Sequence, residues 1–432
     1  MFEQSLRVKT LSGYFVCCSP RVRLAPAEIP LGSCLELFLR PTGSTTASPC
    51  YRIWSVEKTL RIFPVFLWPS ARALRLLLPM SLSQQDGPVI LVDPHPRRIE
   101  RIFDEPTKRR LEKLGRVIWH DGSPASAEHI DRYLPQTIAL IGQSPLDKAR
   151  LDRAPQLRAV FNVESNFLPN IDYTECHRRG IPVLSTAPVY ARPVAELALA
   201  MAISLARRMH EADAALRIGK EFKGDNHDSF LLHGKPLALV GFGNLGRALL
   251  PLLRPFTREI LIHDPWVQSS VLREMDVITA SLDECFTRAR VVFLLAANTS
   301  ENTGKIGARH FASMTPGSVV ILASRAALVN FPELLAAARS GQIRAGIDVW
   351  PEEPIPADEP GRTTPNTLLQ AHRLGSVPEI QPLIGQLVVD DLEAIIAGLA
   401  PQRCQRAVLE TVTKLRSIPV GAWSLSDTTR KP

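Results

Sequence analysis

The stretch "LALVGFGNLGRALLPLL", Leu237 to Leu253, decides the fold of the chain, because an apolar run meets three glycines and a helical pattern follows. The glycines have the spacing G-x-G-x-x-G. Gly241 permits a tight turn, Gly243 lets a backbone approach a pyrophosphate closely, and Gly246 allows a helix to pack on a strand. Because the motif follows a strand and opens a helix, we predict that it binds a dinucleotide rather than only forming a turn.

The residues around this turn favour one dinucleotide. Asn244 and Leu245 begin the helix, whose free N–H groups attract a pyrophosphate. The next predicted strand ends in Asp264, which lies 23 residues after Gly241, close to the spacing expected for an acid on the adenosine ribose. A carboxylate there accepts the ribose hydroxyls and repels a 2′-phosphate, and no Arg or Lys follows it in "HDPWVQ". The sequence therefore predicts NAD in preference to NADP.

Apolar strands alternate with helical patterns on both sides of the glycine stretch. Before it lie "PVILVD", "RVIWHD", "TIALIG", "LRAVFNV" and "IPVLST", and after it "EILIHD", "DVIT", "VVFLLAA", "SVVILAS", "RAGIDVW" and "NTLLQAH". A long helical segment, 193–220, separates the two series, and its apolar first half indicates burial between domains or subunits. This pattern is typical of an α/β protein with two doubly wound parallel-sheet domains.

Composition and charge exclude several classes of protein. Residues 1–79 hold ten Lys and Arg against four Asp and Glu, so most of the net charge of +8 lies there and the rest is nearly balanced. We therefore expect no nucleic-acid partner. We also expect no membrane partner, because the apolar stretch 62–80 is broken by prolines and arginines, and the stretch 194–206 is short and contains Glu196.

The seven cysteines and the first 79 residues bear on the protein's location. The cysteines form no zinc-ligand spacing and no disulfide framework, so we predict no metal and a reduced, cytoplasmic protein. Residues 1–79 lack periodicity, and Met80 is followed at once by a strand pattern. We expect a disordered extension or a misassigned start there, and an Arg-rich targeting peptide is the alternative.

Three charged side chains follow the later strands of the second series. "SVVILASR" ends in Arg325, "DVWPEEP" contains Glu353, and "NTLLQAH" ends in His372. Ligands of open parallel sheets bind beyond the carboxyl ends of the strands, so we expect these residues to converge. Hydride transfer to a 2-keto acid needs a cation for the carboxylate and a proton donor for the carbonyl oxygen. A carboxylate beside the imidazole would hold it in place and favour its protonated form.

From about Pro88 the chain resembles the D-isomer-specific 2-hydroxyacid dehydrogenase family, on the segments "SRAALVN", "DVWPEEP", "LLQAH", "RRGIPVLSTAP" and "VAELALAMAI". The resemblance implies an NAD-dependent oxidoreductase that transfers a hydride between nicotinamide and a small 2-hydroxy or 2-keto acid. Arg325 would bind the carboxylate, and His372 with Glu353 would form the acid–base pair. Asp348 and the backbone around Ala323 would hold the nicotinamide, and the helix 194–206 would take part in a homodimer.

The resemblance also implies a domain plan. A flavodoxin-like substrate domain would comprise residues 80–188 and about 376–416, and a Rossmann NAD-binding domain residues 189–375. Residues 417–432 would form a flexible tail.

The chain departs from the family pattern at three places. Family members carry a Gly-rich loop that receives the substrate carboxylate, but here the loop reads "NVESNFLPN", with Glu164, Ser165 and Asn166 near the expected glycines. Glu164 could repel a second acidic group on a substrate or pair with a cationic one. Ala326 replaces a glycine, and Arg373 stands where small or apolar residues are usual. An NAD(H)-binding sensor, like the family's corepressor relatives, therefore remains an alternative to an enzyme.

Overall fold

The computed structural model describes residues 87–220 and 227–416, and five short strands between residues 6 and 64. Packing divides the chain into two units, Met1–Ser81 and Leu82–Pro432. In the first unit β1 (Leu6–Thr10) pairs antiparallel with β2 (Gly13–Cys17) and β3 (Leu37–Phe38), and β4 (Tyr51–Val56) pairs antiparallel with β5 (Thr59–Pro64). The remainder of 1–79 and the predicted tail 417–432 lie outside the described residues, so the expectations for both stay predictions.

The first sheet of the second unit has the strand order β18-β10-β9-β8-β6-β7. Its parallel strands are β6 (Val89–Asp93), β7 (Arg116–Trp119), β8 (Thr137–Gly142), β9 (Ala159–Asn162) and β10 (Val183–Ser185). The short β18 (Gln405–Arg406) adds an antiparallel edge. Counted along the chain, the five parallel strands have the order 2-1-3-4-5, which confirms the predicted flavodoxin-like arrangement.

Short helices cover the two faces of this first sheet. They are α1 (Ile99–Ile102), α2 (Glu105–Glu112), α3 (Ala127–Tyr133), α4 (Lys148–Asp152), α5 (Tyr173–Arg178), α13 (Gln381–Ile396) and α14 (Leu409–Val412). Residues 99–112 form two helices rather than one continuous helix. Asp104 is extended and its carboxylate accepts the Thr107 N–H at 2.8 Å, so it caps the start of α2 and separates it from α1.

The second sheet is parallel throughout, with the order β13-β12-β11-β14-β15-β16-β17. Its strands are β11 (Leu237–Val240), β12 (Ile260–His263), β13 (Ile278–Thr279), β14 (Val291–Leu294), β15 (Ser318–Leu322), β16 (Ile343–Ile347) and β17 (Thr367–Leu369). Its covering helices include α8 (Asn244–Leu253), α9 (Ser269–Glu274), α10 (Leu282–Arg288), α11 (Ala308–Ser313) and α12 (Phe331–Arg339). The order reverses between β11 and β14, which makes this the ligand-binding crevice of a Rossmann sheet.

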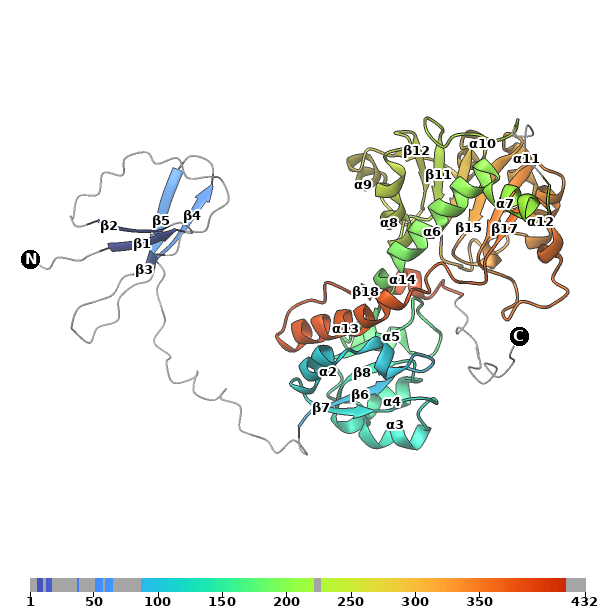
Figure 1. The fold of residues 1–432 in the computed structure, drawn as a ribbon. Helices are drawn as coiled ribbons and strands as arrows, with labels where there is room; N and C mark the ends of the chain where they lie inside the picture. The colour runs from blue at the N-terminus through green and yellow to red at the C-terminus, as the bar shows by residue number, and fades with distance from the viewer. Residues whose placement is uncertain are drawn as a thin grey trace, which may run out of the picture. The chain divides into compact units, whose positions relative to one another are not determined.

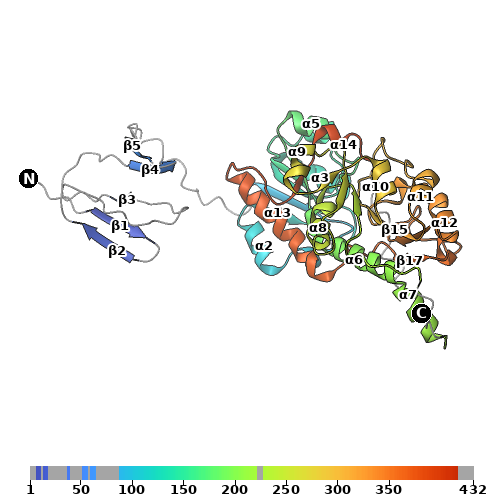
Figure 2. The same ribbon diagram turned by 90° about the horizontal axis from the view of Figure 1, so that it is seen from above.

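The predicted helix 193–220 consists of two helices, α6 (Pro188–Arg207) and α7 (Met209–Arg217), which Arg208 separates at a φ of 53°. By length and composition α6 is apolar enough to cross a membrane. It instead packs against α8, β15 and β16, and α6 lies beside α8 in both views of the chain (Figures 1 and 2). The buried Arg344 of β16 donates to the carbonyl oxygen of Leu205 at 3.0 Å and ties the end of α6 to the sheet. Helix α6 is therefore a core helix.

The C-terminal part of the chain returns to both domains. Helix α13 packs on α1 and α2, which are distant from α13 in the sequence. Figure 1 shows α13 beside α2. After β18 and α14, the chain reaches the loop that follows β14. The Ser300 N–H donates to the Lys414 carbonyl at 2.9 Å, the Arg416 N–H donates to the Asn298 carbonyl at 3.0 Å, and Lys414 pairs with Glu301 at 2.8 Å. We call residues 413–416 the return segment.

Candidate active site

The glycine turn has the geometry that its three glycines suggest. Gly241 has a φ of +100°, and a Cβ there would lie 2.4 Å from the backbone nitrogen of Ala296. A Cβ on Gly246 would lie 2.6 Å from the Gly241 carbonyl oxygen, so this glycine permits close helix packing. A Cβ on Gly243 would meet no atom within 4 Å, and Gly243 lines a cavity. Two glycines therefore serve the fold, whereas the third leaves open space beside the start of α8.

Asp264 follows β12 and lies against the same turn. Its Oδ2 accepts the N–H of Phe242 at 2.6 Å and its Oδ1 accepts the N–H of Trp266 at 2.9 Å. Each carboxylate oxygen has two lone pairs, so both can still accept a hydroxyl. Asn244 and Leu245 also line the cavity, and the Asn244 amide donates to Gln405 Oε1 at 2.7 Å.

His372 and Glu353 form a hydrogen-bonded pair, with 2.7 Å between His372 Nδ1 and Glu353 Oε2. The second oxygen of Glu353 accepts the Trp350 N–H at 3.0 Å, which fixes the carboxylate. Burial raises the pKa of Glu353, but the hydrogen bonds from His372 and Trp350 and the charges of His372 and Arg325 together hold this pKa below its usual value. His372 lines the cavity, and its Nε2 has no protein partner among the described residues. This nitrogen is free to exchange a proton with a ligand.

Asp348 fixes the backbone around His372. Its carbonyl oxygen accepts the His372 N–H at 2.7 Å, and its Oδ1 accepts the Arg373 N–H at 2.8 Å. Burial raises the pKa of Asp348 above its usual value, against the backbone hydrogen bond from Arg373. Ala323, at the end of the neighbouring β15, lines the cavity together with Asp348.

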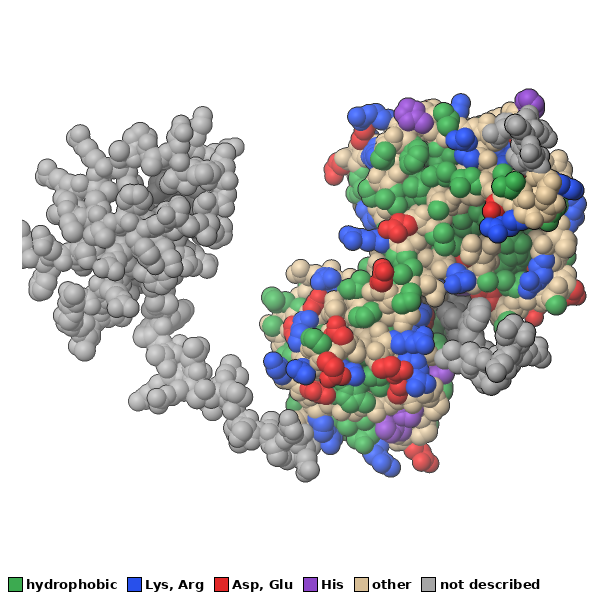
Figure 3. Space-filling view, viewed as in Figure 1, with side chains coloured by type: hydrophobic (Ala, Val, Ile, Leu, Met, Phe, Trp, Pro, Cys, Tyr) green, Lys and Arg blue, Asp and Glu red, His purple; other side chains and the backbone are tan. Residues whose placement is uncertain are grey.

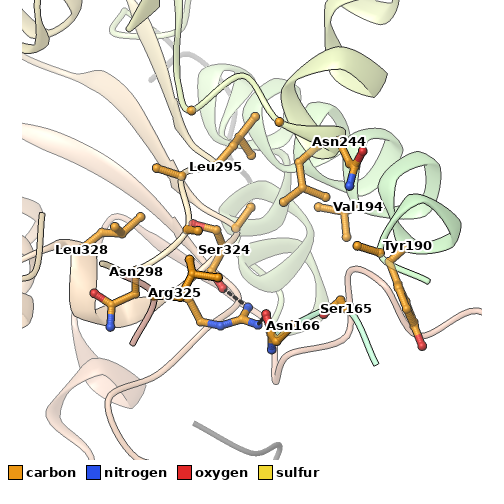
Figure 4. Close-up of a pocket in the computed structure, with 18 of the residues that line it drawn as sticks. Ser165, Asn166, Tyr190, Val194, Asn244, Leu295, Asn298, Ser324, Arg325 and Leu328 are labelled. Carbon is orange, nitrogen blue, oxygen red and sulfur yellow. Dashed lines mark hydrogen bonds between the residues drawn. The ribbon is translucent and has the colours of Figure 1, made fainter. Parts of the chain in front are cut away.

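The Arg325 guanidinium joins the two domains of this unit (Figure 4). It donates to its neighbour's carbonyl, Ser324 O, at 2.5 Å and to Asn166 Oδ1 of the first sheet's domain at 2.5 Å. Burial lowers the pKa of Arg325 from its usual value. In the part of the chain that the structure describes, no carboxylate lies within ion-pair distance of this guanidinium. The cation is therefore held in a desolvated site that favours an anion.

Glu164 is paired within the protein. The side chain is buried, and both of its oxygens accept hydrogen bonds from Arg97, at 2.6 Å from Nε and 3.0 Å from Nη2. The Arg97 guanidinium also lies 5.5 Å from the centre of the Tyr190 ring. The negative charge of Glu164 is thus compensated by Arg97, and a role of this side chain toward a substrate stays a prediction. The sequence did not reveal Arg97, because its partner is 67 residues away.

One cavity of about 1810 Å³ unites these residues. Gly243 and Asp264 line one part, and Arg325, His372, Ser165 and Asn166 line another. Ligand pockets typically have about 300–1,000 Å³, so this cavity has room for a dinucleotide and a second small molecule. Two of the site residues predicted from the sequence do not line the cavity: Gly246 packs behind the turn, and Glu353 reaches the cavity through His372.

A Rossmann sheet, a second parallel-sheet domain and a shared cleft with an arginine and a histidine–carboxylate pair define a two-domain, nicotinamide-dependent dehydrogenase. The family described as "D-isomer specific 2-hydroxyacid dehydrogenase, NAD binding domain" matches residues 199–373. The chain belongs to the D-isomer-specific 2-hydroxyacid dehydrogenase family, and it is an NAD-dependent oxidoreductase.

Individual relatives agree with this assignment. The glyoxylate reductase of Thermococcus litoralis is 30% identical, over 59% of this chain and 79% of that protein. The D-3-phosphoglycerate dehydrogenase of Mycobacterium leprae is 28% identical, over 69% of this chain and 56% of that longer protein. The crystal structure of a phosphoglycerate oxidoreductase from Rhizobium etli is 37% identical, with a TM-score of 0.67, over 76% of this chain and 99% of that one.

Proposed function

We propose that the protein interconverts a small 2-keto acid and the corresponding 2-hydroxy acid, with Arg325, His372 and Glu353 in the roles that their positions suggest. The observation that carries the proposal is the cavity itself. It holds a half-buried arginine and an imidazole outer nitrogen, neither of which has an acidic partner among the described residues, both beside the expected dinucleotide site.

The dinucleotide fits the residues that would hold it. Gly243 leaves open space at the start of α8, where free N–H groups favour a pyrophosphate, and Asp264 presents lone pairs for ribose hydroxyls. Bound NADH would supply the hydride. The carboxylate of Asp264 disfavours a 2′-phosphate, which supports NAD over NADP.

The side chains then account for binding and proton transfer. Arg325 would hold the substrate carboxylate, since a planar guanidinium can donate two parallel hydrogen bonds to it. His372 Nε2 would give a proton to the carbonyl oxygen in reduction and remove the hydroxyl proton in oxidation. Glu353 orients the imidazole through Nδ1 and stabilises its positive charge.

The proposal extends to assembly and location. Met209, Leu216, Ile218 and Leu231 on and near α7 are each more than half exposed. Hydrophobic side chains also gather on the face of this domain that Figure 3 displays. Exposed apolar groups of this kind support a homodimer that covers them. We place the protein in the cytoplasm, because no described cysteine pairs with another.

Oxidation of NADH by the purified protein tests the function. Glyoxylate, pyruvate, hydroxypyruvate and larger 2-keto acids would be supplied in turn, and the nicotinamide absorbance followed. At least one should be reduced, and His372→Ala should slow its turnover by about 100- to 10,000-fold while NADH binding persists. If NADH binds tightly and no keto acid is reduced, the enzyme proposal fails and the sensor alternative replaces it.

A further inference from the structure

The wall of the cavity beside His372 is rich in arginine. Four arginines line it. Arg97 follows β6, Arg98 directly precedes α1, and Arg101 lies within α1. The fourth, Arg373, directly follows His372. Ser376 and Gln381 supply polar groups to the same lining.

Packing brings these segments together around Tyr190 of α6. The Arg97 guanidinium lies 5.5 Å from the ring centre, and a Cβ on Gly375 would lie 3.5 Å from Cδ1 of the same ring. The segment that carries Arg373 and the segment that carries Arg97 therefore both contact Tyr190. Helix α13, whose first residue Gln381 lines the cavity, packs so closely on α1 that a Cβ on Gly385 would lie 2.2 Å from the Ile102 carbonyl oxygen.

The acids of this wall are already paired. Glu164 binds Arg97 through both oxygens, and Glu100 lies 3.4 Å from Arg98, which Asp121 also approaches at 3.4 Å. Arg101 and Arg373 are exposed, and within residues 87–220 and 227–416 neither has an acid within ion-pair distance. The wall thus has two uncompensated positive charges. The Arg373 backbone is fixed by its bond to Asp348, one residue from the acid–base histidine.

We infer that the preferred substrate is a 2-keto acid with a second anionic group, a carboxylate or a phosphate, which Arg373 and Arg101 bind. This inference rests on the proposed function and names its substrate class. Arg325 would take the carboxylate next to the keto group, and the second anion would meet Arg373, which lines the same cavity directly after His372. Glu164 does not oppose the second anion, because Arg97 neutralises it.

The test compares kcat/KM for singly and doubly anionic 2-keto acids. Pyruvate and hydroxypyruvate are the singly charged probes, 2-oxoglutarate and oxaloacetate carry a second carboxylate, and 3-phosphohydroxypyruvate carries a phosphate. At least one doubly anionic probe should be preferred about ten-fold or more over both singly charged probes. The doubly anionic probe with the higher kcat/KM, dicarboxylate or phosphate, identifies which second anion the arginine-rich wall binds.

Variants then assign the preference to the two arginines. A hydrogen bond to a charged group typically affects binding about ten- to hundred-fold, so Arg373→Ala and Arg101→Ala should each reduce the doubly-over-singly anionic ratio by that factor. Arg403→Ala is the matched control. Arg403 is exposed on the domain that also carries Arg101, pairs with Asp390 and does not line the cavity. Arg403→Ala should therefore leave the doubly-over-singly anionic ratio of kcat/KM as in the native protein.

The failure of this inference can be told apart from failure of the proposed function. Reduction of pyruvate with no preference for a second anion would overturn the inference alone. A preference that survives both arginine variants would also overturn it. If the native protein reduces no keto acid of either class, the proposed function fails first and the inference fails with it. Melting temperatures of the variants show whether any loss comes from unfolding.

Discussion

Two alanine substitutions in one turn separate the glycines that the fold needs from the glycine that a ligand needs. At Gly241 an alanine Cβ would lie 2.4 Å from Ala296 N and 2.5 Å from Ala296 Cα, in a backbone with a φ of +100°. A positive φ costs a non-glycine residue about 1–2 kcal/mol, and overpacking against fixed atoms costs about 1–3 kcal/mol more. Gly241→Ala should therefore reduce the free energy of unfolding by roughly 2–5 kcal/mol.

At Gly243 the same substitution meets no protein atom within 4 Å and requires no left-handed backbone. The added methyl group would instead occupy the space in which we place the pyrophosphate. A group of that size changes affinity by about 10- to 100-fold in a fitted site, so the Kd for NADH should rise by that factor.

Thermal unfolding and NADH fluorescence titration measure the two effects on the same preparations. A stability loss of 2–5 kcal/mol should lower the Tm of a domain of this size by roughly 4–20 °C, and only for Gly241→Ala. If Gly243→Ala binds NADH like the native protein, the dinucleotide does not lie on this turn. If both variants lose stability equally, the turn is purely structural.

Three further predictions concern the site and the assembly. Glu353→Gln should move the basic limb of the reduction rate to lower pH, because the neutral amide of the variant no longer stabilises a positive charge on the neighbouring imidazole. A limb that does not move would exclude the pair. Asp264→Ala should narrow the preference for NADH over NADPH in steady-state kinetics, and a native protein that is faster with NADPH would contradict the ribose assignment. Ile218→Asp, at a side chain that is 70% exposed, should yield a monomer by light scattering if α7 contributes to a dimer, and a native protein that is already monomeric refutes the dimer.

Patterns within one segment predicted most of the fold. The buried strands are continuous apolar runs because both faces of each sheet are covered, and the glycine spacing located the crevice between β11 and β14. Boundaries were less predictable. The predicted helix began at residue 193, but α6 begins at Pro188, because proline is tolerated in the first turn of a helix. The break at Arg208 could not be predicted, because no glycine marks the end of α6.

The only site residues that could be predicted from the sequence are those that follow a predicted strand. Arg325, Glu353 and His372 were found because the strand ends of one sheet lie at one edge. The partners of Glu164 and Arg325 were not found, because Arg97 and Asn166 reach them across 67 and 159 residues of sequence. Contacts of this kind depend on how separate segments pack against each other, so they cannot be predicted from the periodicity of the sequence.

The return segment has a mechanical consequence for turnover. The two domains are joined covalently where α6 begins and again between β17 and α13, so the cleft can open only as a hinge about these two crossings. Residues 413–416 bind the β14 loop on the cofactor domain with two backbone hydrogen bonds and an exposed ion pair, together worth roughly 1–4 kcal/mol. Opening of the cleft therefore requires release of the Arg325–Asn166 and Asn244–Gln405 hydrogen bonds and detachment of the return segment. The frequency of its detachment would then limit how fast product and oxidised cofactor leave, whatever the speed of the chemical step.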